Sequence, residues 1–166
     1  MKKRENSLVF YGIGGEKLKG AGLEILFPSS ALSVMGITEV FSILPAVFKA
    51  LGIIKQFLKT RKPDLVILID FADFNLQVAK AAKRAGIPVL YYIPPKVWAW
   101  RQGRVKKIRE RTDHLAVIFP FEVEFFLKHG LSVSYIGNPL LDNDIVQSET
   151  VVPRDRSGKA GIIGLL

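Results

Sequence analysis

The chain has 166 residues, 49% of them hydrophobic, which is enough to form one domain with a buried core and disfavours disorder. It contains no cysteine and only two histidines, which excludes a disulfide framework and a cysteine-based zinc site and disfavours a histidine metal centre. The net charge of +9 is typical of proteins that bind nucleic acid, an anionic membrane surface or phosphorylated substrates, and composition does not choose among these classes.

The first sixty residues predict two short strands and a helix. Residues 8–11 and 24–27 are short apolar runs closed by Gly or Pro, as expected for strands. The glycines at positions 12, 14 and 15 lack the Gly-Lys-Ser/Thr of a phosphate-binding loop, so we interpret them as a tight strand-to-helix turn. Residues 43–59 have the i, i+3, i+4 apolar spacing of a helix.

Residues 34–48 carry more apolar side chains than a helix with one solvated face requires. Two interpretations stay open: the stretch belongs to the core, or it is an interfacial segment that dips into a bilayer, helped by the lysines that follow it. Charged residues and Pro45 interrupt the apolar stretch, which disfavours a transmembrane helix.

The clearest section is a strand, helix and strand between residues 64 and 93. The run D-L-V-I-L-I-D at 64–70 is typical of a parallel strand buried on both faces. Asp73 is a suitable N-cap for a helix that ends near residue 85, with Gly86 as its C-cap. A second strand is predicted at 89–93, and the unit as a whole implies a parallel sheet.

The alternation continues to the end of the chain. Helices are predicted at 101–111 and 121–129 and strands at 115–119 and 133–136, followed by a polar linker at 142–160 and the start of another apolar strand at 161–166. The pattern predicts an α/β fold: a Rossmann-like, doubly wound domain over residues 1–141 with a mainly parallel sheet.

Asp70 is the most informative candidate for a functional residue. It stands at the carboxyl end of a buried parallel strand, where ligands bind in open α/β sheets. Two simpler explanations are that it caps the next helix or pairs with a nearby Lys. Asn75, five residues later, is expected to hydrogen-bond substrate or to brace the loop.

The run P-P-K-V-W-A-W-R at residues 94–101 follows the next strand at the same edge of the sheet. Its aromatic residues are expected to fold the loop back onto the core and also to form a wall of the active-site cleft. Residues 96–111 contain seven Lys or Arg and one acid. Three interpretations of this basic run stay open. It forms a solvated helix face, or it attracts the phosphates of a substrate or of anionic lipids. The third is a nucleic-acid site, although no nucleic-acid-binding signature accompanies the run.

Four of these segments together resemble the lipid A disaccharide synthase family of GT-B-fold glycosyltransferases. They are V-M-G-I-T-E-V at 34–40, I-D-F-A-D-F-N at 69–75, V-W-A-W-R at 97–101 with Arg104, and Y-I-G-N-P-L-L-D at 135–142. Their order and spacing fit the family, and the match covers nearly the whole chain. Asn138 stands where many members carry His.

The resemblance implies an inverting transferase that joins UDP-2,3-diacylglucosamine to 2,3-diacylglucosamine 1-phosphate, forming a β-1,6-linked disaccharide and UDP without a metal or other cofactor. It implies that Asp70 deprotonates the 6-hydroxyl of the acceptor, which suits a carboxylate fixed at a strand end. A cytoplasmic enzyme, peripheral on the inner face of the inner membrane and binding no nucleic acid, is expected, and a homodimer of the full-length enzyme is a further expectation.

The resemblance and the positions described above identify the residues that are expected to bind substrate or to contact the membrane. The substrate-binding candidates are Asp73, Asn75, Trp98, Trp100, Arg101 and Arg104. The candidates for membrane contact are Ile37, Val40, Phe41, Leu44, Val47 and Phe48. Compared with the family, the chain is expected to lack a first strand and helix, to hold only the start of the UDP-binding domain at 161–166, and to be inactive alone. Another GT-B transferase of cell-envelope synthesis and a non-catalytic lipid-binding module are the alternatives.

Overall fold

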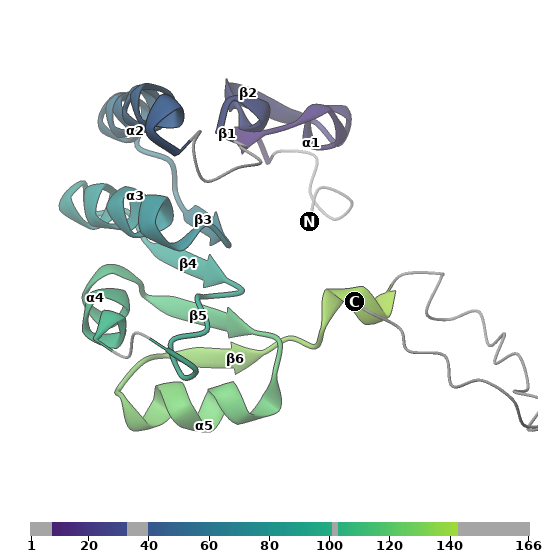
Figure 1. Cartoon of the computed structure of the whole chain (residues 1–166), viewed down its shortest axis with the longest axis vertical. Coiled ribbons are helices and arrows are strands. Elements are labelled where there is room, and N and C mark those ends of the chain that lie inside the picture. Colours follow the sequence, from purple (N-terminus) through teal and green to yellow (C-terminus); the bar gives the residue numbers. More distant parts are fainter. Residues whose placement is uncertain (1–7, 33–39, 101–102, 143–166) are drawn as a thin grey trace, which may run out of the picture.

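The computed structural model describes residues 8–32, 40–100 and 103–142, which form an α/β fold with two separate parallel sheets. The first sheet contains β1 (Phe10–Gly14) and β2 (Leu23–Pro28). The second contains, in spatial order, β3 (Val66–Ile69), β4 (Val89–Tyr92), β5 (His114–Val117) and β6 (Val133–Tyr135). Neighbouring strands are parallel throughout, so the carboxyl ends of β3 to β6 share one edge (Figure 1). The predicted α/β class and parallel pairing are confirmed.

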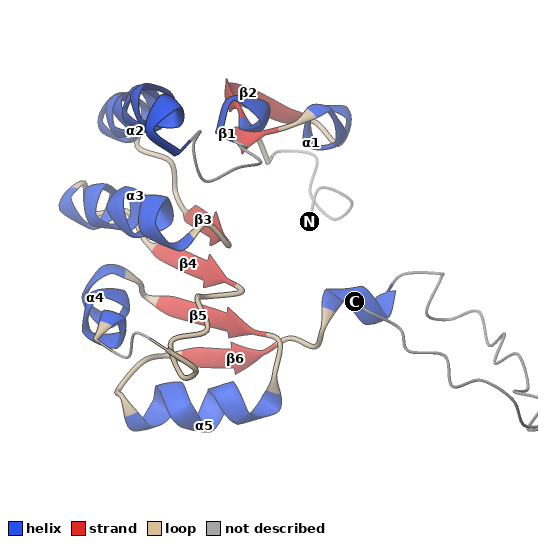
Figure 2. Cartoon of the chain, viewed as in Figure 1, coloured by secondary structure: helices blue, strands red, loops and turns tan. Residues whose placement is uncertain are grey.

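Helices alternate with these strands along the chain (Figure 2). They are α1 (Glu16–Gly20), α2 (Val40–Arg61), α3 (Ala72–Arg84), α4 (Arg104–Arg111) and α5 (Pro120–Lys128), with single 3-10 turns at Ser29–Leu32 and Pro139–Asp142. Helix α3 packs against α2 and also against α4. The predicted linker and final strand, residues 142–160 and 161–166, lie almost entirely outside the described residues.

The core lies between the four-stranded sheet and its helices. Three adjacent strands, β3 to β5, each contribute aliphatic side chains that are at most 3% exposed. They are Leu68, Val89, Leu115 and Val117. Burying an aliphatic side chain of this size contributes about 1.5–3 kcal/mol to folding before the entropy cost is counted. The same apolar contacts fix the position of the strand ends on which the candidate site depends.

The expectation that residues 64–70 are buried on both faces is wrong. Leu68 is buried, but Leu65 is 42% and Ile69 is 58% exposed. The reason is that, among the residues that the structure describes, β3 is an edge strand: it pairs with β4 and has no other hydrogen-bonded strand on the side where Figure 1 draws β1 and β2.

The start of α3 also differs from the prediction that Asp73 is its N-cap. The N-cap position is Phe71, without a side-chain capping bond, and Asp73 is the second residue of the helix. Its carboxylate binds Arg104 instead of a backbone N–H at the helix start. The predicted end is confirmed, because α3 stops at Arg84 and Gly86 follows with a left-handed φ of 74°.

Asp113 ties the amino ends of two strands together. Its Oδ2 accepts a hydrogen bond from Val89 N–H at 2.8 Å, and its Oδ1 accepts one from Lys83 Nζ at 2.5 Å. Burial alone would raise the pKa of Asp113, but these hydrogen bonds and the Lys83 charge outweigh it, so the pKa lies below its ordinary value. The ionised form therefore stabilises the fold.

We predict that Asp113→Ala lowers the free energy of unfolding at pH 7 by about 1 kcal/mol, a modest value because the carboxylate is 44% exposed and solvent screens its ion pair. The stabilisation is complete above the unfolded carboxyl pKa of about 3.9 and disappears as pH falls through the lower folded value. Urea titrations at neutral and acid pH measure the difference, with Asp64→Ala, at an exposed site with no ion pair in the described part of the chain, as the control. A gap between wild type and variant that persists at low pH contradicts this account.

Candidate functional site

Backbone strain gathers where β3 and β4 end. Asp70 and Phe71 follow β3 and have φ values of 49° and 42°, and Ile93 follows β4 with φ 55°. Each non-glycine residue in this left-handed region costs roughly 1–3 kcal/mol unless surrounding contacts enforce it. Such strain at the carboxyl edge of a parallel sheet, where ligands bind in this fold class, marks the edge as the candidate site.

Two buried side chains hold this turn. Asn75 is 9% exposed, and its Nδ2 donates to the carbonyl oxygens of Ile69 at 2.9 Å and Asp70 at 2.5 Å. The hydroxyl of Tyr91, a fully buried residue of β4, also donates to the Asp70 carbonyl, at 3.0 Å. Three hydrogen bonds therefore fix the backbone around Asp70, and of the two expectations for Asn75 the bracing of the loop is the one observed.

The side chain of Asp70 is left at the surface by this arrangement. The residue is exposed, and the structure gives its carboxylate no hydrogen bond or ion pair within the described part of the chain. The simpler explanations, a helix cap or a lysine pair, are not observed. A carboxylate that is exposed and has no partner in the described part of the chain is open to a hydroxyl group of a bound molecule.

Burial raises the pKa of the Tyr91 hydroxyl strongly and outweighs the lowering effect of the hydrogen-bonding Asn75, while the negative charge of Asp70 raises this pKa by a smaller amount. Tyr91 therefore stays protonated and keeps donating to the Asp70 carbonyl across the neutral range. Tyr91 could not be predicted as a site residue, because within an apolar strand it is indistinguishable from an ordinary core aromatic.

Asp73 and Arg104, both predicted to bind substrate, bind each other. One terminal nitrogen of Arg104, Nη2, donates to the two carboxylate oxygens of Asp73 at 2.7 and 2.9 Å. The Arg104 side chain is 18% exposed and that of Asp73 is 80% exposed. The pair joins the first turns of α3 and α4 beside the Asp70 turn, and it leaves the other guanidinium nitrogens of Arg104 for another ligand.

The loop after β4 is anchored through Trp98. Its Nε1 donates to Glu122 Oε1 at 2.9 Å, and Glu122, which is 2% exposed, also accepts the N–H of Phe119 through Oε2 at 3.1 Å. Val97 is 1% and Trp100 is 63% exposed. The predicted folding of the loop onto the core is thus observed for Val97 and Trp98. Sequence reasoning missed Glu122, for which an acid in the first turn after a proline was the available signal.

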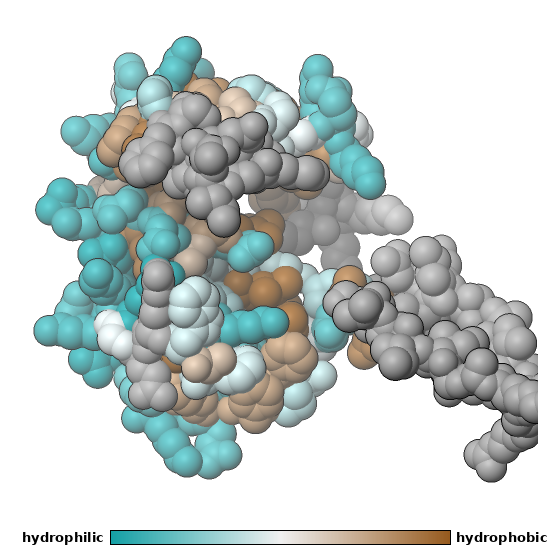
Figure 3. All heavy atoms as spheres, viewed as in Figure 1, coloured by the Kyte–Doolittle hydropathy of each residue, from teal (hydrophilic) through white to brown (hydrophobic). Residues whose placement is uncertain are grey.

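Exposed apolar side chains surround this edge of the sheet. Each of the four strands is followed by at least one of them, and we call the set the apolar rim. It consists of Ile69, Phe71, Trp100, Phe121, Tyr135, Ile136, Leu140 and Leu141, each at least 45% exposed. Figure 3 shows apolar residues near the carboxyl ends of the central strands. Several exposed apolar side chains after neighbouring strands are typical of an interaction site.

The predicted membrane segment is described only in part. Within α2, Leu44 is 41% and Phe48 is 66% exposed, and Val47 is half-buried. Val40 and Phe41 belong to α2, but their side chains, like Ile37 and the predicted substrate ligand Arg101, lie outside what the structure describes. No helix of the described residues is both long and apolar enough to cross a bilayer.

Asp70 lines neither of two open grooves on the described part of the chain. One, of about 630 Å³, lies at the turn from β1 to α1 and is lined by residues that include Gly14, Gly15 and Ser30. The tight turn predicted there is confirmed, and Gly14 packs closely, since a Cβ at this position would come within 2.9 Å of the end of the Leu18 side chain, which would have to shift. No group of three metal-ligating side chains occurs among the described residues.

Comparison with known proteins gives a consistent result. The family model described as Lipid-A-disaccharide synthetase matches residues 1–158. The chain is 52% identical over 136 residues to the lipid-A-disaccharide synthase of Geobacter metallireducens, covering 82% of this chain and 35% of that protein. It is 49% identical over 142 residues to the lipid-A-disaccharide synthase of Syntrophus aciditrophicus, and this match covers 86% of this chain and 37% of that protein. It is 40% identical over 158 residues to the lipid-A-disaccharide synthase of Myxococcus xanthus, and this match covers 95% of this chain and 41% of that protein.

The chain therefore spans between 35% and 41% of the length of these three relatives. The match nevertheless includes every residue of the Asp70 turn, the Trp98 loop and the Asp73–Arg104 pair. With a family model that covers almost the entire sequence, the chain belongs to the Lipid-A-disaccharide synthetase family.

Proposed function

We propose that this chain is the acceptor-binding part of a lipid A disaccharide synthase. The reaction transfers 2,3-diacylglucosamine from its UDP conjugate to 2,3-diacylglucosamine 1-phosphate and releases UDP. The observation that carries the proposal is the exposed Asp70 carboxylate on a braced turn at the carboxyl edge of a parallel sheet, in a chain of this family.

In this proposal the 6-hydroxyl of the acceptor attacks the anomeric carbon of the donor, and the bond from that carbon to the UDP oxygen breaks. The hydroxyl proton moves to the Asp70 carboxylate, and UDP leaves with the bonding electrons. Attack from the face opposite UDP inverts the anomeric centre to give the β-1,6 linkage. Asn75 and Tyr91 act as positioning residues, because they hold the backbone that carries the base.

The remaining site residues are proposed to bind the acceptor. Arg104 uses only Nη2 to hold Asp73, so its other nitrogens can meet the 1-phosphate, together with Arg101. Trp98 and Trp100 form the wall next to the sugar, and the apolar rim receives acyl chains. Asp73 and Asn75 are proposed to assist acceptor binding. Asp73 does so by holding Arg104, and Asn75 by holding the Asp70 turn.

Membrane contact is proposed for the first turns of α2. Leu44 and Phe48 present apolar surface, and lysines follow them along the helix, which is the composition of an interfacial segment. The same membrane contact is proposed for Ile37, Val40, Phe41 and Val47. The enzyme would then be peripheral on the inner face of the inner membrane, where its lipid substrates are, and the full-length protein would form a homodimer.

The domain organisation follows the same proposal. Residues 1–141 are the acceptor domain, 142–160 a linker and 161–166 the start of the UDP-sugar domain. Because the relatives are more than twice as long as this chain, we expect the 166 residues alone to have no transferase activity.

The test compares this chain with a full-length protein that contains it. We expect disaccharide and UDP from the full-length protein with acylated UDP-glucosamine as donor, no product with donors that lack acyl chains, and none from the 166-residue chain with either. Turnover of unacylated donors instead would support a different GT-B transferase. Product formation by the 166 residues alone would refute the proposed division of the protein.

A further inference from the structure

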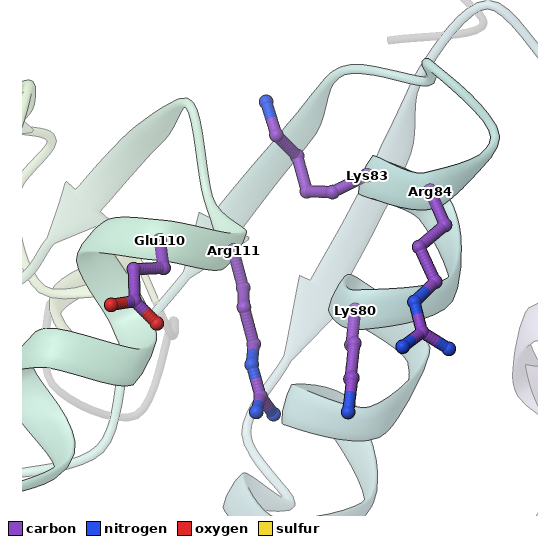
Figure 4. Close-up of a pocket in the computed structure, with 5 residues that line it drawn as sticks. All are labelled: Lys80, Lys83, Arg84, Glu110 and Arg111. Carbon is purple, nitrogen blue, oxygen red and sulfur yellow. The ribbon is translucent and has the colours of Figure 1, made fainter.

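A second cluster of charged residues lies at the end of the molecule opposite Asp70. A groove of about 440 Å³ separates the last turns of α3 and α4, and its lining is basic (Figure 4). The lining residues are Lys80, Lys83, Arg84, Glu110 and Arg111. Because α3 begins beside Asp70 and its 13 residues extend about 20 Å, the groove is separate from the candidate active site.

Two of the five charges in this groove are already compensated. Lys83 binds Asp113 at 2.5 Å, and Glu110 lies 4.0 Å from Lys106 on its own helix. In Figure 4 the Lys83 side chain turns away from those of Lys80 and Arg111. The cationic character of the groove therefore comes from the other three residues.

Lys80, Arg84 and Arg111 extend toward the same side of the groove (Figure 4), and no ion pair is present at any of them in the described part of the chain. Arg111 is held in place because its Nη1 donates to the Leu76 carbonyl on α3 at 3.0 Å, which leaves the remaining N–H groups free to bind a ligand. A fixed guanidinium beside two further cations is a suitable arrangement for an anion with several oxygens.

Helix dipoles explain part of this arrangement. Cations in the last turn of a helix are favourable, and Lys83, Arg84 and Arg111 occupy such positions. Lys80 lies one turn earlier than Arg84, and a like-charge pair at this spacing destabilises a helix by a few tenths of a kcal/mol. A bound anion would remove that repulsion. Hydrophilic residues also cover the side of the molecule where α3 and α4 lie (Figure 3).

We propose that the groove between α3 and α4 binds a phosphate group through Lys80, Arg84 and Arg111. This phosphate is distinct from that of the acceptor, and the proposal does not rest on the proposed transferase activity. The same chemistry is offered by the headgroup of an anionic phospholipid and by free inorganic phosphate, and the experiment separates these two sources.

The experiment uses the 166-residue chain and the pair of substitutions Lys80→Ala/Arg84→Ala. Sedimentation with vesicles of phosphatidylglycerol in phosphatidylcholine measures headgroup binding, and NMR titration with inorganic phosphate measures binding of the free anion. Each Lys or Arg near an anionic surface contributes about 1 kcal/mol, so the double variant should bind vesicles roughly 30-fold more weakly. If the double variant instead keeps vesicle binding and no longer binds inorganic phosphate in the NMR titration, the free anion is the ligand.

The control is Lys17→Ala/Lys107→Ala, which removes two exposed positive charges outside the groove. It should weaken vesicle binding by less than about 3-fold, since these lysines lie outside the site. Lys80→Gln/Arg84→Gln replaces the alanine variant if circular dichroism shows that the latter is unfolded. Equal losses for both pairs would attribute binding to net charge and overturn the proposal, as would wild-type protein that binds neither probe.

Discussion

Asp70→Asn in a full-length protein that contains this chain is expected to lower kcat by roughly 10²–10⁴-fold, the usual contribution of a positioned general base. Asparagine keeps the shape of the side chain but cannot accept the proton of the acceptor hydroxyl. The substitution leaves the fold intact, because Asn75 and Tyr91 hold the backbone carbonyl of residue 70 and not its carboxylate. Steady-state assays of disaccharide formation measure the effect.

The matched control for that experiment is Asp64→Asn, the same chemical change at an exposed position before the amino end of β3. It should leave kcat unchanged, and both variants should unfold at the urea concentration of the wild type. Turnover by Asp70→Asn within about 3-fold of the wild-type value would remove this carboxylate from the mechanism, since a lost base costs far more.

Asn75→Ala is expected to have the second large effect, on stability and activity together. It removes the side chain that donates to both the Ile69 and the Asp70 carbonyl oxygens, and it leaves a small void in a buried position. The Asp70 carbonyl keeps the Tyr91 hydroxyl, but the Ile69 carbonyl loses its side-chain donor. An unsatisfied, partly buried acceptor costs about 1–3 kcal/mol, so the free energy of unfolding should fall by roughly that amount. Without this brace the strained turn relaxes and Asp70 shifts, so kcat of the full-length protein should also fall.

Urea denaturation and steady-state kinetics test this second prediction. Gln77→Ala, at an exposed position on the same helix, controls for the loss of a polar side chain and should change neither quantity. If Asn75→Ala keeps the stability of the wild type, the hydrogen bonds of Asn75 do not support the turn. If only stability falls while kcat is kept, Asp70 does not depend on them for its position.

Much of the fold followed from local patterns. Continuous apolar runs, glycines at helix ends and alternating strand and helix spacing identified the six strands and the helices α2 to α5 of the described residues to within a few residues, whereas α1 was expected only as a turn into a helix without bounds. The position of Asp70 at a strand end could be predicted for the same reason, because chain order alone fixes which residue follows a parallel strand. Resemblance of four short segments to one family then agreed with the comparisons over the same residues.

The predictions that failed depended on contacts between distant residues. The sequence of residues 64–70 is that of a buried strand, yet β3 is at an edge, because its burial depends on which strands pair with it. Asp73 has the right chemistry and place for an N-cap, but Arg104, 31 residues later, lies within reach and binds it. Tyr91 and Glu122 support the site through side-chain hydrogen bonds that span more than twenty residues. Tyr91 stands in no local motif, and the capping box of Glu122 does not reveal its bond to Trp98.

By itself, the sequence determined the succession of strands and helices, the position of Asp70 at a strand end and the family, since these depend on neighbours along the chain. The tertiary structure decided which side of the Asp70 turn is fixed and which is free, where the apolar rim gathers and which cations share the groove between α3 and α4. Those properties arise when residues far apart in the chain meet, and the directions of their side chains are set by packing, which no local pattern encodes.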